Sequence, residues 1–234
     1  VYLQEISVPH WERGTKEFCS AEQLSRPLKI SALGGSVSTN GTLIAEVIEV
    51  SDIEALKLMD PSAIKGKIVF FSKPFDPKHI VTFKSYGACV PQRVDGAKKA
   101  AKMGALAVLI RPMTHSHDDE PHTGVMIYEE GVTKIPAASL SNKGADMLSA
   151  AIKKTKEPIK VTLEMDCKSN PDKKSHNVIA EIRGSKYPEK VIVVGGHLDS
   201  WDLGEGAHDD GAGIVHSIEV LKTFKGLGIK PNHT

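Results

Sequence analysis

The residues whose types and spacing point most clearly to chemistry lie between 195 and 213, where two glycine-rich segments carry histidines and several aspartates. His197 and Asp199 are two residues apart, so on an extended chain their side chains project to the same side and the carboxylate can orient the imidazole. Asp209 and Asp210 follow in the second glycine-rich turn, where no bulky neighbour obstructs a carboxylate. These residue types could supply half of a site for zinc or a hard cation, and a carboxylate can bridge two zinc ions roughly 3.5–4 Å apart.

The same residues also have structural interpretations. His197 and Asp199 could form a hydrogen-bonded pair in an ordinary loop, with no ligand at all. The adjacent aspartates could cap the N-terminus of a helix, where the helix dipole favours acidic groups, and this role is compatible with metal binding. Asp202 and Glu205 are expected to be solvated loop charges.

The elements that would position this segment are a strand before it and a helix after it. Val191–Val194 is a continuous β-branched run, typical of a strand buried on both faces of an α/β sheet. Ligands of such sheets bind beyond the carboxyl ends of the strands, and His197 follows this one directly. Gly226 and Gly228 are expected to end the helix. The helix itself is predicted from apolar residues at helical spacing: Ile214, Val215, Ile218, Leu221 and Phe224.

The region from Leu28 to about Cys167 is expected to be β-rich, because short apolar runs alternate with glycine and proline. The predicted strands are 28–33, 42–50, 67–71, 106–110 and 158–165, and helical patterns interrupt them near 94–103 and 144–154. Before this region, residues 1–12 alternate as a strand that Pro9 should end. After it, the polar segment 168–177 is predicted to be a linker.

Composition narrows the classes of protein. The 234 residues are 40% hydrophobic with a net charge of +1, which supports a sizeable core and excludes the basic surface that nucleic-acid binding needs. No apolar run approaches the roughly 18 residues of a membrane span, and no signal segment opens the chain. Because the sequence begins at Val1 rather than Met, we expect a piece of a longer protein. The three cysteines fit neither a disulfide framework nor a CxxC zinc site.

The segment GGHLDSWDLGEGAHDDGAG resembles the first metal-ligand block of the zinc aminopeptidase/glutamate carboxypeptidase superfamily, specifically its carboxypeptidase Q-like (plasma glutamate carboxypeptidase-like) branch. This block is the most specific element of the resemblance. The similarity spans nearly the whole chain, through further stretches that read like the same branch: Val8–Gly14, Ala97–Arg111, Pro121–Gly124, Lys134–Ala137 and Gly184–Glu189.

The resemblance implies a role for each residue of the block. His197 would be a zinc ligand, and Asp209 would be the carboxylate shared between two zinc ions. Asp199 would be the catalytic-site carboxylate that orients His197, and Asp210 would not be a ligand. The peptide bond between Asp209 and Asp210 is expected to be cis, as is common in this superfamily.

The resemblance also implies the architecture, an α/β peptidase fragment with a partial mixed sheet, helices and an inserted β-rich protease-associated domain. The expected divisions are an N-terminal peptidase segment at 1–20, the inserted domain at 21–167 and a partial zinc peptidase domain at 168–234. The whole enzyme would be a secreted or periplasmic exopeptidase that hydrolyses dipeptides or short peptides with a zinc-activated water. Members of the family tend to form homodimers.

The sequence departs from the family pattern in one respect. The general-base glutamate, the zinc-binding glutamate beside it and the later Asp and His ligands are absent from these 234 residues. We therefore expect this chain alone to be inactive, with its zinc site empty or partly occupied. The alternative is a non-enzymatic protease-associated module for protein interaction.

A second group of potential ligands lies between residues 115 and 122. This segment could bind zinc or nickel adventitiously, but its polar character favours a solvated loop near the substrate cleft. Its residues are His115, His117, Asp118, Asp119, Glu120 and His122.

Overall fold

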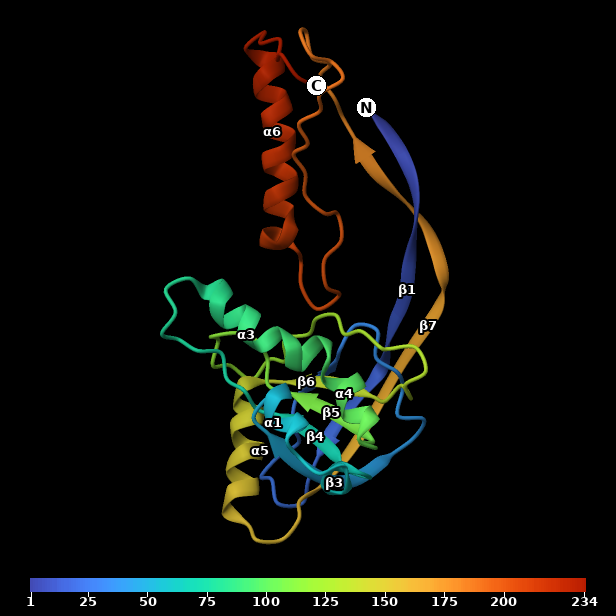
Figure 1. The fold of residues 1–234 in the computed structure, drawn as a ribbon, viewed down its shortest axis with the longest axis vertical. Helices are drawn as coiled ribbons and strands as arrows, with labels where there is room; N and C mark the ends of the chain where they lie inside the picture. The colour runs from blue at the N-terminus through green and yellow to red at the C-terminus, as the bar shows by residue number, and fades with distance from the viewer. The chain divides into compact units, whose positions relative to one another are not determined.

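The computed structural model describes all residues from Val1 to Thr234, and the chain forms two compact units. Unit 1 comprises Val1–Pro9 and Asp172–Thr234, and unit 2 comprises His10–Pro171. The chain crosses between the units twice, within two long strands, β1 (Tyr2–Ser20) and β7 (Lys160–Ile179) (Figure 1).

Most of one seven-stranded mixed sheet belongs to unit 2, in the order β1-β7-β3-β4-β5-β6-β2. Neighbouring strands from β3 to β6 are parallel, whereas β2 is antiparallel to β6 and β7 is antiparallel to β3. The remaining strands are β2 (Ile30–Ala32), β3 (Leu43–Val50), β4 (Ile68–Phe71), β5 (Ala107–Ile110) and β6 (Ala137–Leu140). The helices of this unit are α1 (Ile53–Lys57), α2 (Pro61–Ile64), α3 (Thr82–Val94), α4 (Gly96–Lys102) and α5 (Asn142–Lys154).

Both faces of this sheet are covered. The alternation of side chains along β4 sends Ile68 and Phe70 into one core cluster and Val69 and Phe71 into another, and all four are fully buried. Residues of α5 contribute to the first cluster, and residues of α1 and α4 contribute to the second. Parallel strands need helical cover on both faces, so unit 2 is an α/β unit and not the mainly β-rich one expected.

The predicted strands and helices of unit 2 are confirmed in place, but several elements were missed. α3 was missed because Gly87 and Pro91 interrupt it. The small residues of β6 carry little strand propensity, although Ala137–Leu140 is entirely buried. β6 is therefore recognised only through its pairing with neighbouring strands in the sheet.

Two expectations about chain breaks were wrong. Pro9 does not end the first strand, and residues 168–177 are not a linker, because β1 and β7 run through both positions. β1 is an edge strand, and the paired register of β7 with β3 ends at Leu163, so each proline can sit where one side of its strand lacks a partner. The polar composition of 168–177 reflects exposure rather than irregular structure.

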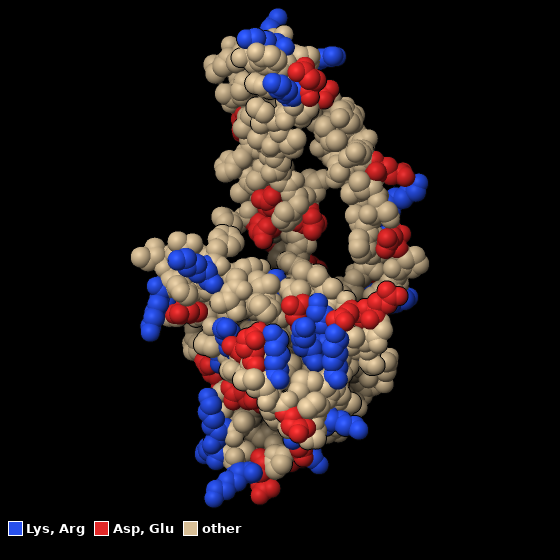
Figure 2. Space-filling view, in the orientation of Figure 1, with Lys and Arg blue, Asp and Glu red and all other residues tan.

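The surface of unit 2 mixes both signs of charge. Figure 2 shows Lys and Arg side chains interspersed with Asp and Glu over its visible face. Exposed ion pairs include Lys29–Glu120 and Lys102–Glu129, each 2.6 Å long. Such pairs contribute little stability individually, so the core and not the surface holds unit 2 together.

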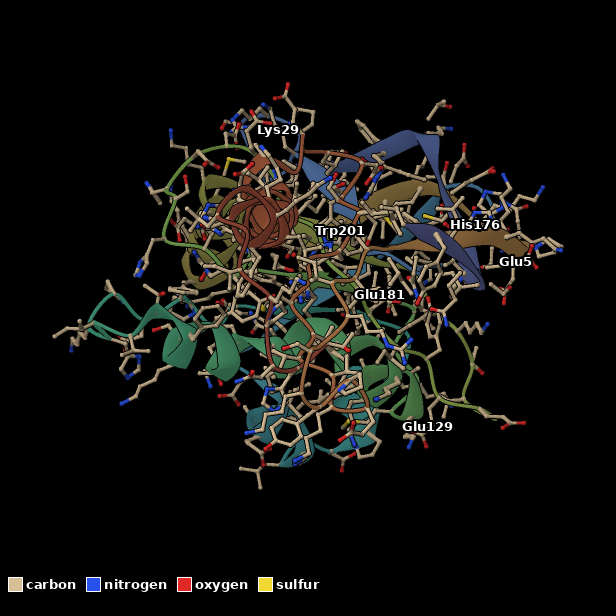
Figure 3. All side chains as sticks on the ribbon, turned by 90° about the horizontal axis from the view of Figure 1, so that it is seen from above. Glu5, Lys29, Glu129, His176, Glu181 and Trp201 are labelled. Carbon is tan, nitrogen blue, oxygen red and sulfur yellow. The ribbon has the colours of Figure 1, made fainter.

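Unit 1 contains the N-terminal part of β1, the C-terminal part of β7, the irregular helical segment η1 (Ala207–Ala212) and helix α6 (Gly213–Gly226). Glu5 pairs with Lys174 at 3.0 Å across the two strands, on the stretch where Figure 3 labels Glu5 and His176. The predicted helix and its glycine-marked end are confirmed, with Gly228 at φ +65° just beyond α6. No helix of the chain has the length and apolar character needed to cross a membrane.

The predicted strand at Val191–Val194 is wrong for this structure. The run forms no ladder, and its side chains are exposed, Val193 to 83%. A strand exists only through hydrogen bonds to neighbours, and the backbone of this run has one such bond, from Ile192 N to the Thr234 carbonyl at 2.8 Å. The β-branched composition is therefore not matched by a partner strand within these residues.

Candidate metal centre

The candidate site is built from two irregular backbone segments of unit 1. The first runs from Gly195 to Trp201, and the second is η1, whose backbone leaves helical geometry at Asp209 and Asp210. Gly206 precedes η1 with φ +67°, a left-handed conformation that suits glycine. The peptide bond between Asp209 and Asp210 is cis, as the family resemblance implied.

Asp210 joins the two segments through its carboxylate. Its Oδ2 accepts a hydrogen bond from the backbone N–H of His197 at 3.0 Å, and its Oδ1 accepts one from the backbone N–H of Gly213 at 3.1 Å. The first bond holds the backbone of the histidine, and the second satisfies an N–H group at the start of α6. Asp210 therefore positions the site through main-chain contacts, while its neighbour Asp209 points its carboxylate at the imidazole.

Two glycines make this arrangement possible. A Cβ atom added at Gly196 would lie 2.6 Å from the Ile214 nitrogen and 2.8 Å from Oδ2 of Asp210. A Cβ atom at Gly213 would lie 2.7 Å from Oδ2 of Asp210. Real Cβ contacts are not so short, so the glycines in this block are explained by close approach of backbone to the Asp210 carboxylate.

The three predicted site residues are brought together. Nε2 of His197 lies 3.0 Å from Oδ1 of Asp209, although twelve residues separate them. On the other side of the ring, Nδ1 lies 2.7 Å from the main-chain carbonyl oxygen of Asp199 and 3.3 Å from its carboxylate Oδ1. The carbonyl of Asp199 thus makes the shorter contact, which the spacing of side chains did not predict.

These contacts indicate how the imidazole carries its proton. A carbonyl oxygen can only accept, so Nδ1 donates to Asp199. In a neutral ring Nε2 then has a lone pair that faces the Asp209 carboxylate, and two acceptors 3.0 Å apart need a cation between them. A proton on Nε2 meets that need. A zinc ion also meets it, because zinc binds histidine nitrogen and carboxylate oxygen at about 2.0–2.1 Å.

The pKa of His197 reflects the same contacts. It is raised above its ordinary value first by the hydrogen bond to the Asp199 carbonyl and further by the Asp209 carboxylate, against an opposing effect of desolvation. Because zinc binds the neutral imidazole, a metal at Nε2 displaces that proton. The donor types and their separation therefore fit a zinc ion at His197 and Asp209.

The donors are few and solvent-accessible. The side chains of His197, Asp209 and Asp199 are 52%, 84% and 91% exposed. Nowhere in the 234 residues do three or more His, Cys, Asp or Glu side chains gather in a way that could hold a metal ion. Structural and catalytic zinc sites use three or four protein ligands, so these two donors alone do not complete one.

The second histidine-rich segment is held by pairwise contacts. His117 Nε2 lies 2.8 Å from Asp146 on α5, and His122 lies 3.6 Å from Asp118. Asp119 accepts a hydrogen bond from Ser141, the N-cap of α5, at 2.7 Å. The segment therefore anchors a loop to α5, in agreement with the preferred interpretation as an exposed loop.

Comparison with known proteins relates the chain to a family of peptidases. The family model described as Peptidase family M28 matches residues 177–234, the stretch that holds the site. Carboxypeptidase Q from Bos taurus is 42% identical over 235 aligned residues, which cover 100% of this chain and 48% of the relative. The chain is a relative of carboxypeptidase Q, and its residues 177–234 match peptidase family M28. It spans about half the length of the curated relatives it matches.

Solved structures of M28 peptidases also resemble this chain. A peptidase M28 precursor from Shewanella amazonensis superposes with a TM-score of 0.92 at 36% identity, covering 99% of this chain and 52% of that one. A zinc aminopeptidase from Bacillus subtilis has a TM-score of 0.56 at 22% identity, covering 91% and 44%, which shows likeness of fold alone. The mixed sheet with helices therefore matches the corresponding half of an M28 peptidase structure.

The contacts of Asp210 predict the effect of removing one acceptor. Asp210→Asn replaces one of two carboxylate oxygens with an NH₂ group, which cannot accept from the N–H of His197 or Gly213. We expect a loss of zinc affinity of about tenfold, the lower end for residues that orient a metal ligand. Zinc titration followed by NMR of the His197 ring measures it. Glu205→Gln is the matched control, and equal affinity in both variants would contradict the role of Asp210.

Proposed function

We propose that this chain supplies part of the active site of a zinc exopeptidase that hydrolyses dipeptides or short peptides. His197 would hold a zinc ion through Nε2, and Asp209 would hold zinc through its carboxylate, the one that the family resemblance implies is shared between two ions. Asp199 holds the ring of His197 in the orientation that turns Nε2 toward Asp209. The relationship to carboxypeptidase Q and the family match over residues 177–234 support this assignment.

The observation that carries the proposal is the convergence of His197 Nε2 and Asp209 Oδ1 at 3.0 Å. Two acceptors aimed at one point, with the opposite ring nitrogen committed to Asp199, form the geometry of a cation site. When bound, zinc supplies a Lewis acid and an activated water for attack on a peptide carbonyl. The chain's own contribution is to hold two donors and the ring tautomer in place.

The remaining roles follow the family resemblance. We assign 1–20 and 168–234 to the peptidase domain and 21–167 to an inserted protease-associated domain that shapes the substrate cleft. The corresponding compact units divide at Pro9/His10 and at Pro171/Asp172. A secreted or periplasmic location and a homodimer belong to the same proposal.

The ligand count predicts that the 234-residue chain alone has no peptidase activity. It holds two converging donors, and no group of three or more His, Cys, Asp or Glu side chains that could hold a metal ion. After metal-free purification and addition of zinc, dipeptide hydrolysis should stay at the rate of a protein-free blank. Activity that elutes with the chain in size-exclusion chromatography would overturn this prediction.

A chimera tests the function itself. Residues 1–234 replace the aligned half of a carboxypeptidase Q relative, so that the second half of the relative provides the other ligands. We expect zinc-dependent dipeptide hydrolysis by the chimera and none by either half alone. A folded chimera that binds zinc but does not cleave peptides would favour the alternative of a non-enzymatic interaction module.

A further inference from the structure

An apolar and cationic projection lies at the start of α3 in unit 2. Ile80 is 100% exposed and Phe83 is 79% exposed, with the exposed Val81 between them. Figures 1 and 3 both show α3 and the loop before it projecting away from the sheet of this unit. Large adjacent apolar side chains are seldom left in water without a use, so this projection is a candidate contact surface.

The projection is held in place by its own hydrogen bonds. The buried Ser85 donates from Oγ to the Asp76 carbonyl at 2.6 Å and contacts Nδ1 of His79 at 2.8 Å. Further along the same face of α3, Cys89 and Gln92 are also buried. The helix therefore turns one face inward and fixes Ile80, Val81 and Phe83 on the outside.

The projection is mainly cationic. Residues 77–94 contain Lys78, Lys84 and Arg93 and no aspartate or glutamate. Two aspartates flank this stretch: Asp76 accepts a hydrogen bond from the backbone N–H of Lys78 at 2.9 Å, and Asp95 pairs with Lys98 at 2.6 Å. Lys78 and Lys84 are exposed and form no ion pair. Arg93 donates to the Tyr86 hydroxyl at 3.1 Å and lies over the Tyr86 ring. The surface thus combines exposed apolar groups with unneutralised cations.

We infer that this projection, Lys78 to Lys84 with the exposed face of α3, binds the surface of an anionic phospholipid bilayer. Ile80, Val81 and Phe83 enter the interface between headgroups and acyl chains, and Lys78 and Lys84 contact lipid phosphates. A convex apolar tip needs no complementary pocket in a fluid bilayer, whereas a protein partner must provide a concave, acidic one. A symmetric contact with a second copy would place like charges against each other, which disfavours self-association.

Vesicle sedimentation tests the inference with the 234-residue chain. We expect pelleting with vesicles of phosphatidylcholine and phosphatidylserine, and little with phosphatidylcholine alone. Phe83→Ser should lower the partition coefficient at least about tenfold, because it removes the largest inserted side chain. Leu58→Ser is the matched control, since Leu58 is 89% exposed elsewhere in unit 2, and it should bind as the unaltered chain does.

A second pair of variants tests the contribution of Lys78 and Lys84. Lys78→Ala with Lys84→Ala should weaken binding about tenfold or more, while the equal charge change Lys153→Ala with Lys154→Ala on α5 should leave binding intact. Circular dichroism and thermal unfolding confirm the fold of each variant. The inference is overturned if anionic vesicles do not pellet the chain, or if Phe83→Ser binds as well as the control. Concentration-dependent dimerisation that requires Phe83 would assign the surface to protein contact and would equally overturn it.

Discussion

His197→Ala in the chimera is expected to lower kcat/KM for dipeptides by about a thousandfold. A bound metal stabilises the transition state by several kcal/mol, and each 1.4 kcal/mol corresponds to a factor of ten in rate. Loss of Nε2 leaves Asp209 as the single donor at this point of the chain. The metal then loses one of its ligands and is no longer held in position. Steady-state kinetics with added zinc, together with metal analysis of the purified protein, measure both consequences.

The control for this experiment is a second histidine of the same unit. His216 lies on an exposed turn of α6, and His216→Ala removes an imidazole without touching the site. We expect it to keep activity within about twofold, the range of ordinary surface substitutions. Equal loss in both variants would show that the effect of His197→Ala is structural, and normal activity of His197→Ala would remove the assignment of His197 as a ligand.

Gly14→Ala is expected to destabilise unit 2 by about 1–3 kcal/mol, the cost of forcing an extra atom into a filled space. A Cβ atom at Gly14 would lie 2.5 Å from the carbonyl oxygen of Asp166 and 2.9 Å from its carbonyl carbon, and it would also overlap the Asp166 side chain. Asp166 belongs to β7 and Gly14 to β1, so one of these strands must shift against the other. The midpoint of urea unfolding reports the loss.

A matched glycine should respond in the opposite direction. Gly87 lies within α3, and a Cβ atom there meets nothing within 4 Å. Gly87→Ala should raise the free energy of unfolding by about 0.5–1 kcal/mol, because alanine loses less conformational freedom in a helix. If Gly14→Ala matched it in sign, close approach between β1 and β7 would be excluded as the reason for Gly14.

The sequence predicted most local elements of unit 2 because their apolar runs are also core strands. β4 and β5 combine β-branched or large apolar residues with complete burial, so composition and position agree. The same reasoning was wrong at Val191–Val194, where composition is as favourable but no neighbouring strand pairs with the run. Strand formation depends on a partner, and a partner is not visible in the composition of one segment.

At the candidate site, residue type and spacing identified the donors but not their supports. His197, Asp199 and Asp209 come together as predicted, yet the shorter contact to the ring comes from the main chain of Asp199. The role of Asp210 as acceptor for two backbone N–H groups was also missed, because it depends on the fold of the loop rather than on spacing. Gly196 and Gly213, which both lie against the Asp210 carboxylate, were the sequence signal that could have indicated this role.

The pairing of β1 with β7 has a consequence for how this architecture is assembled. The strands are antiparallel neighbours, since Gln4 and Glu5 contact Asn177 and Lys174 while Gly14 meets Asp166. The chain therefore leaves unit 1 and returns to it at adjacent points of one two-stranded ribbon. A short turn can join two antiparallel strands. A single hairpin turn can therefore replace the whole of unit 2, and the path of the remaining chain stays the same.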